Sequence, residues 1–184
     1  AAGITNVSSF NTFIGQSSGS GNYQGNNNTY VGHNTGVGNS SGNQNILIGS
    51  QAGYNNFGSS NSFLGYAAGY SNLSGSSNTF LGRFAGYSNF GGRFNTFIGV
   101  CSAEGTTAGS NTFVGYRSGF TNTTGTANTF IGVKAGEANT TCNNNTFIGN
   151  NAGLLNSTGT GNTFMGAGAG DANTDANANT FIGT

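Results

Sequence analysis

Side chains that could act as acids, bases or metal ligands are few and scattered in this sequence. His33 is the only histidine, and the chain carries four acidic and four basic residues among 184. Asp171 and Asp175 lie in a Gly/Ala/Asn stretch without the spacing of a calcium-binding loop, and Glu104 and Glu137 stand alone. Because catalysis and metal binding need convergent groups, we expect no enzyme activity, no cofactor and no metal site.

The composition also excludes several classes of partner. Charged residues make up 4% of the chain and the formal net charge is zero, so there is no electrostatic attraction for nucleic acid or anionic lipid. No apolar run approaches the roughly twenty residues of a membrane span. Gly-x-Gly triplets such as Gly36-Val37-Gly38 are not followed by the Lys-Ser/Thr of a phosphate loop. We therefore expect neither a nucleic-acid partner nor membrane insertion.

The residues that do recur define a tandem repeat. The pentapeptide NTFIG starts at Asn11 and returns ten more times with conservative changes, at intervals of 16 or 17 residues, ending with the copy at Asn179. With that Asn as position one, a small residue and Gly fill positions eight and nine, and Asn often fills position twelve. The consensus is NTFIGxxAGxxNxxGxx. Repeats of this length are one supersecondary unit each.

One repeat departs from the others. The unit Asn95–Ser110 has sixteen residues, carries Ala103 where Gly is expected and lacks the Asn of position twelve. We expect a local bulge or an altered loop in this unit.

The repeat length and the frequent Gly predict a β-solenoid. Seventeen residues are too few for a helix pair, and Gly would break a helix, whereas Gly and Asn tolerate the left-handed backbone of tight corners. We expect an all-β parallel β-solenoid (a β-roll or β-helix) with coils of about 17 residues. Residues 1–10 would form an entry segment, and residues 11–184 one solenoid of ten coils plus a final NTFIG strand. At about 4.8 Å per coil, ten coils make a rod of roughly 50 Å.

In such a stack every repeat position becomes a column of like residues. Neighbouring strand residues point to opposite faces, so the Phe of position three and the aliphatic residue of position four face opposite ways. We expect Phe inside against the small residue of position eight, with the reverse left open. The Asn of position one would form an amide-to-amide ladder between coils.

The outward residues are the candidate binding site. An apolar column along the whole rod exceeds the few hundred Å² that soluble monomers usually expose, so we expect a binding face for another copy, a macromolecule such as a glycan or cell-surface receptor, or a regular solid surface. Its members are Thr12, Ile14, Thr29, Val31, Ile48, Ser62, Leu64, Thr79, Leu81, Thr96, Ile98, Thr112, Val114, Thr129, Ile131, Thr146, Ile148, Thr163, Met165, Thr180 and Ile182.

The two cysteines are expected to stay unpaired within the chain. Cys101 is at position seven of its unit and Cys142 at about position fifteen, two coils further on. The axial offset of roughly 9–10 Å exceeds the reach of a disulfide, about 7 Å between Cα atoms.

The consensus NTFIGxxAGxxNTTGxxNTFIG, clearest from Asn111 to Gly149, resembles the tandem repeats of bacterial and phage tail-fibre proteins and, more distantly, the heads of trimeric autotransporter adhesins. The resemblance covers about Asn11 to Gly183. It implies parallel chains wound as left-handed coils, assembled as a homotrimer with the outward column on a shared axis. It also implies an extracellular, cell-surface or virion location and a structural, adhesive role.

Ice binding is the alternative from a different class. A flat face of Thr-x-Ile rows on a nearly uncharged solenoid, repeating about every 4.8 Å, is also what ice-binding proteins present. The sequence leaves both hypotheses open. Mass in solution and ice shaping would separate them.

Overall fold

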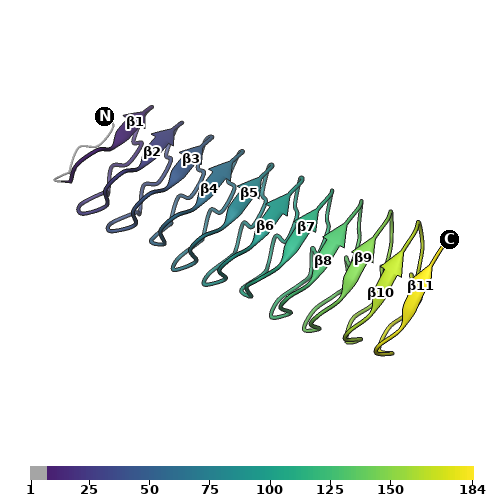
Figure 1. The fold of residues 1–184 in the computed structure, drawn as a ribbon. Coiled ribbons are helices and arrows are strands. Elements are labelled where there is room, and N and C mark those ends of the chain that lie inside the picture. Colours follow the sequence, from purple (N-terminus) through teal and green to yellow (C-terminus); the bar gives the residue numbers. More distant parts are fainter. Residues whose placement is uncertain (1–7) are drawn as a thin grey trace.

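The computed structural model describes residues 8–184, so residues 1–7 of the expected entry segment lie outside the described residues. Within residues 8–184, eleven three-residue strands pair in chain order in one parallel sheet, and the coils stack side by side as a rod with the first and last strands at its opposite ends (Figure 1). This arrangement confirms the parallel β-solenoid of about ten turns. The strands are β1 (Thr12–Ile14), β2 (Thr29–Val31), β3 (Ile46–Ile48), β4 (Ser62–Leu64), β5 (Thr79–Leu81), β6 (Thr96–Ile98), β7 (Thr112–Val114), β8 (Thr129–Ile131), β9 (Thr146–Ile148), β10 (Thr163–Met165) and β11 (Thr180–Ile182).

Each strand consists of positions two to four of the repeat, and like residues pair with like. Phe130 pairs with Phe147, for example, and the pairing of Phe97 with Phe113 continues unbroken across a sixteen-residue coil. The rest of each coil is made of turns, which are also joined to the next coil by backbone hydrogen bonds, such as Gly19 N–H to the Thr35 carbonyl at 2.9 Å. The columns predicted from the repeat therefore exist around the whole coil.

The glycine of position five turns the chain after each strand. Its φ lies between +124° and +143° in all eleven copies, a region that is essentially restricted to glycine. A Cβ atom added at Gly132 would also lie 2.3 Å from the carbonyl oxygen of Gly149 in the next coil. Both the backbone conformation and the close approach of successive coils therefore require glycine here.

The core is a column of stacked aromatic rings inside the coils. The side chains of position three from β2 to β10 are almost completely buried, and successive Phe rings stack, as between Phe113 and Phe130 with centroids 4.7 Å apart. Two coils carry Tyr30 and Leu47 instead, and the Tyr30 hydroxyl is hydrogen-bonded to Asn39. The small residues of position eight complete the same cluster, so the inward placement of Phe is confirmed.

The glycine of position nine lies against the aromatic column. Gly136, for example, has a φ of +60°, and a Cβ atom there would lie 2.5 Å from the Phe130 ring. Ala103 occupies this position in the unusual coil, with a φ of +50°. The Phe97 and Phe113 rings beside it are 5.2 Å apart and inclined by 16°, a looser stack than Phe113–Phe130, which is inclined by 4°.

We expect Ala103→Gly to stabilise the fold. The substitution removes a left-handed alanine, worth about 1–2 kcal/mol, and restores space for the rings, while the flexibility of glycine in the unfolded chain subtracts about 0.4–1 kcal/mol. The expected net gain is about 1 kcal/mol, measured by urea unfolding. Gly136→Ala is the reverse control and should lower stability by more than that. A loss of stability in Ala103→Gly would contradict this explanation of position nine.

The unit Asn95–Ser110 has the altered loop that its sequence predicted, without a bulge in the strand. Its loop is one residue shorter between positions twelve and fifteen. Thr106 and Ala108 stand where the seventeen-residue coils have residues three apart, and Asn56 and Gly58 of the other sixteen-residue coil show the same shortening. Thr106 replaces the missing Asn: its hydroxyl oxygen accepts a hydrogen bond from Asn122 Nδ2 at 3.1 Å. The coil thus keeps its internal polar contact to the next coil.

The Asn columns are bonded differently from the predicted ladder. At position one the Asn111 Oδ1 accepts from the backbone N–H of Asn128 in the next coil at 3.0 Å, and Asn111 Nδ2 donates to the Gly125 carbonyl at 2.8 Å. The prediction of amide-to-amide bonds at this position is therefore wrong for most coils: the side chain joins a backbone N–H of the next coil to a backbone carbonyl. Amide-to-amide bonds occur instead at position twelve, as from Asn139 Nδ2 to Asn122 Oδ1 at 2.8 Å.

Candidate functional site

The side chains of positions two and four project from the outer side of the sheet in two parallel columns, which we call the Thr-x-Ile face. Every member predicted from the sequence lies on this face, in strands β1 to β11. Because the strands pair without offset, the rows are spaced by one strand separation, about 4.8 Å. The fold thus brings all predicted site residues together on one side of the sheet.

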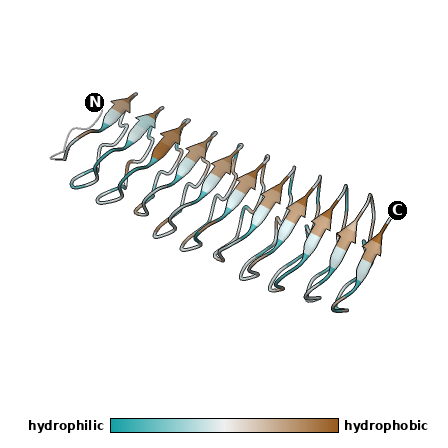
Figure 2. Cartoon of the chain, in the orientation of Figure 1, coloured by the Kyte–Doolittle hydropathy of each residue, from teal (hydrophilic) through white to brown (hydrophobic). Residues whose placement is uncertain are grey.

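The Thr-x-Ile face is uncharged and partly apolar. No Asp, Glu, Lys, Arg or His stands at position two or four of any repeat. Leu64 is 48% exposed and Ile131 is 38% exposed, and Figure 2 shows the hydrophobic colour gathered on the strands, with more polar residues at the strand starts. A continuous apolar stripe along a polar rod is the kind of surface that binds a partner.

Sequence reasoning missed one member of this face. Ile46 occupies position two of β3, where nine of the other strands have Thr and one has Ser, and its side chain is 49% exposed. The strand β3 is consequently hydrophobic along its whole length (Figure 2). The alignment of the repeats alone could have found it, because the repeat period fixes its position.

The face is hollowed at β3–β5. A shallow hollow of ≈ 250 Å³ opens there above the buried Phe63 and Phe80. Its rim is formed by Ile46, Ile48, Ser62, Leu64, Thr79 and Leu81. Ser62 is smaller than the Ile or Thr at position two of the other coils, and this difference leaves space between its neighbours. The face is therefore not uniform along the rod.

Two further columns were not predicted, and both lie on the turns. At position ten, Tyr70 stacks between Tyr54 and Tyr87 with ring centroids 5.0 and 5.1 Å apart. At position thirteen, Phe57 and Phe90 are exposed in the N-terminal half. Their recurrence at the same positions of successive repeats is the sequence signal from which both columns could have been predicted.

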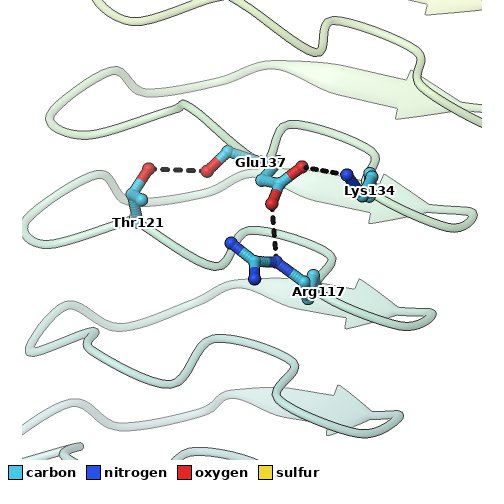
Figure 3. A network of polar contacts seen from close by, with 4 residues as sticks. All are labelled: Arg117, Thr121, Lys134 and Glu137. Carbon is cyan, nitrogen blue, oxygen red and sulfur yellow. Dashed lines mark hydrogen bonds and ion pairs between the residues drawn. The ribbon is translucent and has the colours of Figure 1, made fainter.

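The charged groups lie on the turns rather than on the Thr-x-Ile face. The Glu137 carboxylate forms ion pairs with Arg117 Nε at 2.6 Å and with Lys134 Nζ at 3.4 Å (Figure 3). The backbone carbonyl of Glu137 accepts a hydrogen bond from the Thr121 hydroxyl at 2.6 Å. Arg117 also lies over the Phe120 ring at 3.9 Å. This is a paired carboxylate that joins neighbouring coils, and partly exposed pairs of this kind contribute little to stability, about 0–1 kcal/mol.

The other candidate chemical groups stay apart. His33 and Asp171 are exposed on turns of different coils, and Asp175 is exposed on a further turn. Within residues 8–184 no three His, Cys, Asp or Glu side chains gather in a way that could hold a metal ion. The same described part of the chain has no helix with the length and apolarity of a membrane span.

Both cysteines are free thiols, as the coil geometry predicted. Cys142 is buried, and its thiol hydrogen-bonds to the Ser157 carbonyl at 2.8 Å. Burial raises the pKa of the Cys142 thiol. Burial, together with a hydrogen bond to Glu104 and its negative charge, raises the pKa of the Cys101 thiol. Neither thiol is activated as a nucleophile, because the reactive form is the thiolate.

We expect both thiols to be alkylated more slowly in the folded protein than in the unfolded chain. Raised pKa values leave less thiolate at a given pH, so the folded-state rate should keep rising with pH above about 8.5, the value for a free thiol. Cys101, which is partly exposed, should react before the buried Cys142. Iodoacetamide labelling followed by peptide mass spectrometry, with and without denaturant, measures this. Folded-state rates that match those in denaturant would contradict the placement of both thiols.

No family model matches the chain, and no curated protein or solved structure is significantly similar to it. The Thr-x-Ile face is the feature of the described residues that combines extent, regularity and exposed apolar area.

Proposed function

We propose that this chain is a non-catalytic, structural segment of an extracellular adhesive fibre, and that copies associate through the Thr-x-Ile face. The supporting observation is the uninterrupted, uncharged band of partly exposed aliphatic side chains on eleven in-register strands. A homotrimer around a shared axis, as the resemblance to tail fibres and trimeric adhesins implies, would cover the aliphatic column. The aromatic core of each coil is closed within a single chain, so each copy could fold before it assembles.

A face of this size suits an association of moderate strength. The band is roughly 50 Å long and about 10 Å wide, so two copies would bury about 1,000 Å² in total, near the lower limit for a specific interface. Burial of Leu, Ile and Val side chains would supply the free energy. The association should therefore depend on protein concentration.

A pair of double variants tests the role of the face. Leu64→Asp with Ile98→Asp places two charges on the face, whereas Gln24→Asp with Thr124→Asp adds the same charge on exposed turns. We expect light scattering to give a monomer for the first variant and an assembly for the second, with unchanged circular dichroism for both. Equal masses for the two variants, whether both assembled or both monomeric, would contradict association through this face.

Ice binding is the second candidate, and the Thr column supports it. Seven successive strands, β5 to β11, carry Thr at position two in register, which repeats one hydroxyl and one methyl group about every 4.8 Å. A monomer of 18.4 kDa that shapes ice crystals and shows thermal hysteresis would favour this function. An assembly without either property would exclude it.

A further inference from the structure

Association of two regular rods raises a problem of register. Nearly identical rows repeat about every 4.8 Å, so a shift by one coil or an end-to-end reversal would bring almost the same groups together. Surfaces whose register of pairing is so weakly specified are prone to shift by one repeat. A unique assembly needs a local irregularity that fits in one arrangement only.

The Thr-x-Ile face has such an irregularity at β3–β5. Position two departs from Thr only at Ile46 and Ser62, and position four departs from Ile and Val at Leu64, Leu81 and Met165. Four of these five departures fall within three consecutive strands, and they surround the hollow of ≈ 250 Å³. Leu64 borders the hollow and also projects from the face, 48% exposed. The projecting Leu64 side chain and the centre of the hollow thus lie on the same strand, β4.

We infer that the hollow at β3–β5 sets the register of self-association, with copies parallel and each coil beside the same coil of its neighbour. Leu64 of a second copy would enter the hollow beside Ser62. The lining of the hollow is almost entirely apolar, which suits an aliphatic side chain. The inference rests on the proposed self-association and specifies its geometry.

The position of the hollow along the rod selects the parallel arrangement. The hollow is centred on β4, whereas the middle of the sheet is β6. Antiparallel copies that overlap completely would place β4 against β8, where the rows are regular and leave the hollow empty. Antiparallel copies centred on β4 would leave β8–β11 uncovered. Parallel copies in register fill the hollow and bury all eleven strands, and rotation about an axis along the rod gives this arrangement for two or three copies.

The distribution of charge is compatible with burial of this face between copies. Residues 1–82 contain no Asp, Glu, Lys or Arg, and all eight charged side chains lie between Arg83 and Asp175. Because no charged residue stands at position two or four of any repeat, burial of the Thr-x-Ile face removes no charge from water, which would be costly. The charges stay on the turns of the other half, outside the interface.

Distances between spin labels test the parallel register. In a Cys101→Ser, Cys142→Ala background, single cysteines replace Gln24, Thr124 or Thr158, three exposed residues at position fourteen of different coils. Parallel copies predict nearly the same inter-copy distance at all three sites by double electron–electron resonance. Antiparallel copies with complete overlap would separate the labels along the rod by roughly 40 Å at Gln24 but roughly 15 Å at Thr124, and that pattern would overturn the inference.

Matched variants test whether Leu64 and the hollow set the register. Leu64→Asp and Ile131→Asp each place one charge at position four, the first at the hollow and the second in the regular part of the face. Sedimentation velocity should show the association weakened at least 30-fold by Leu64→Asp and less than 5-fold by Ile131→Asp. Equal weakening by the two variants would overturn the role of the hollow in setting the register, while leaving the proposed self-association intact. A wild-type chain that stays monomeric at all concentrations would instead overturn the proposed function, and the inference with it.

Discussion

Gly132→Ala should destabilise the protein by at least about 3 kcal/mol, the largest effect that we expect from a single methyl group. Gly132 has a φ of +137°, which a residue with a Cβ adopts only with strain of about 1–3 kcal/mol. The added Cβ would also overlap the Gly149 carbonyl at 2.3 Å, and that carbonyl belongs to the backbone of the next coil. Two coils must separate to relieve the contact, so inter-coil hydrogen bonds are lost as well. Urea unfolding measures the change.

Gly105→Ala is the matched control for this prediction. Gly105 is exposed, and a Cβ atom there meets nothing within 4 Å. Its φ is not in the left-handed region, so the change should shift the free energy of unfolding by less than about 0.5 kcal/mol. If both variants unfold at the same urea concentration, the close approach of coils at position five does not control stability.

Asn111→Ala should cost about 2–3 kcal/mol, because it removes the link between backbone groups of neighbouring coils. The Asn128 N–H would lose its acceptor inside the protein, and an unsatisfied buried group costs about 1–3 kcal/mol. The Gly125 carbonyl would keep a second donor, Asn122 Nδ2 at 3.0 Å, which limits the loss. Asn150→Ala, on an exposed turn, is the control and should be nearly neutral. A comparable loss in Asn150→Ala would contradict this role for position one.

Asn111→Asp adds a dependence on pH to the same test. The new carboxylate would still accept from the Asn128 N–H, but its second oxygen would face the Gly125 carbonyl in a buried site. Burial and this repulsion raise the pKa of the new carboxyl above its unfolded value of about 3.9. Since the folded state then binds the proton more tightly, stability should fall as pH rises above about 4. If the difference in stability between the variant and the native protein is the same at pH 3 and pH 7, this prediction is contradicted.

The fold followed from the sequence because a nearly constant repeat spacing leaves the chain few alternative arrangements. A 17-residue period with Gly and Asn at fixed positions determines the coil, and the alternation of Phe and Ile within NTFIG places Phe inside once position eight is seen to be small. The same argument placed Thr112 and Val114 outside. These inferences need only the pleat of a strand and the size of side chains.

The hydrogen bonds of the Asn columns could not be obtained in this way. An amide ladder and an amide-to-backbone bridge both predict an unvaried Asn, and only the path of the turn brings the Gly125 carbonyl near Asn111. The hollow at β3–β5 escaped prediction for a related reason. It arises from Ser62 between Ile46 and Thr79, and such small departures from a consensus become meaningful only when neighbouring coils are placed side by side.

Sedimentation equilibrium of the native chain over a wide range of concentrations tests the central claim most directly. If the Thr-x-Ile face is a surface for self-association, the mass should rise with concentration from 18.4 kDa toward a multiple of that value, and Leu64→Asp should return it to the monomer with the fold intact. A native chain that remains at the monomer mass at every concentration would contradict the claim.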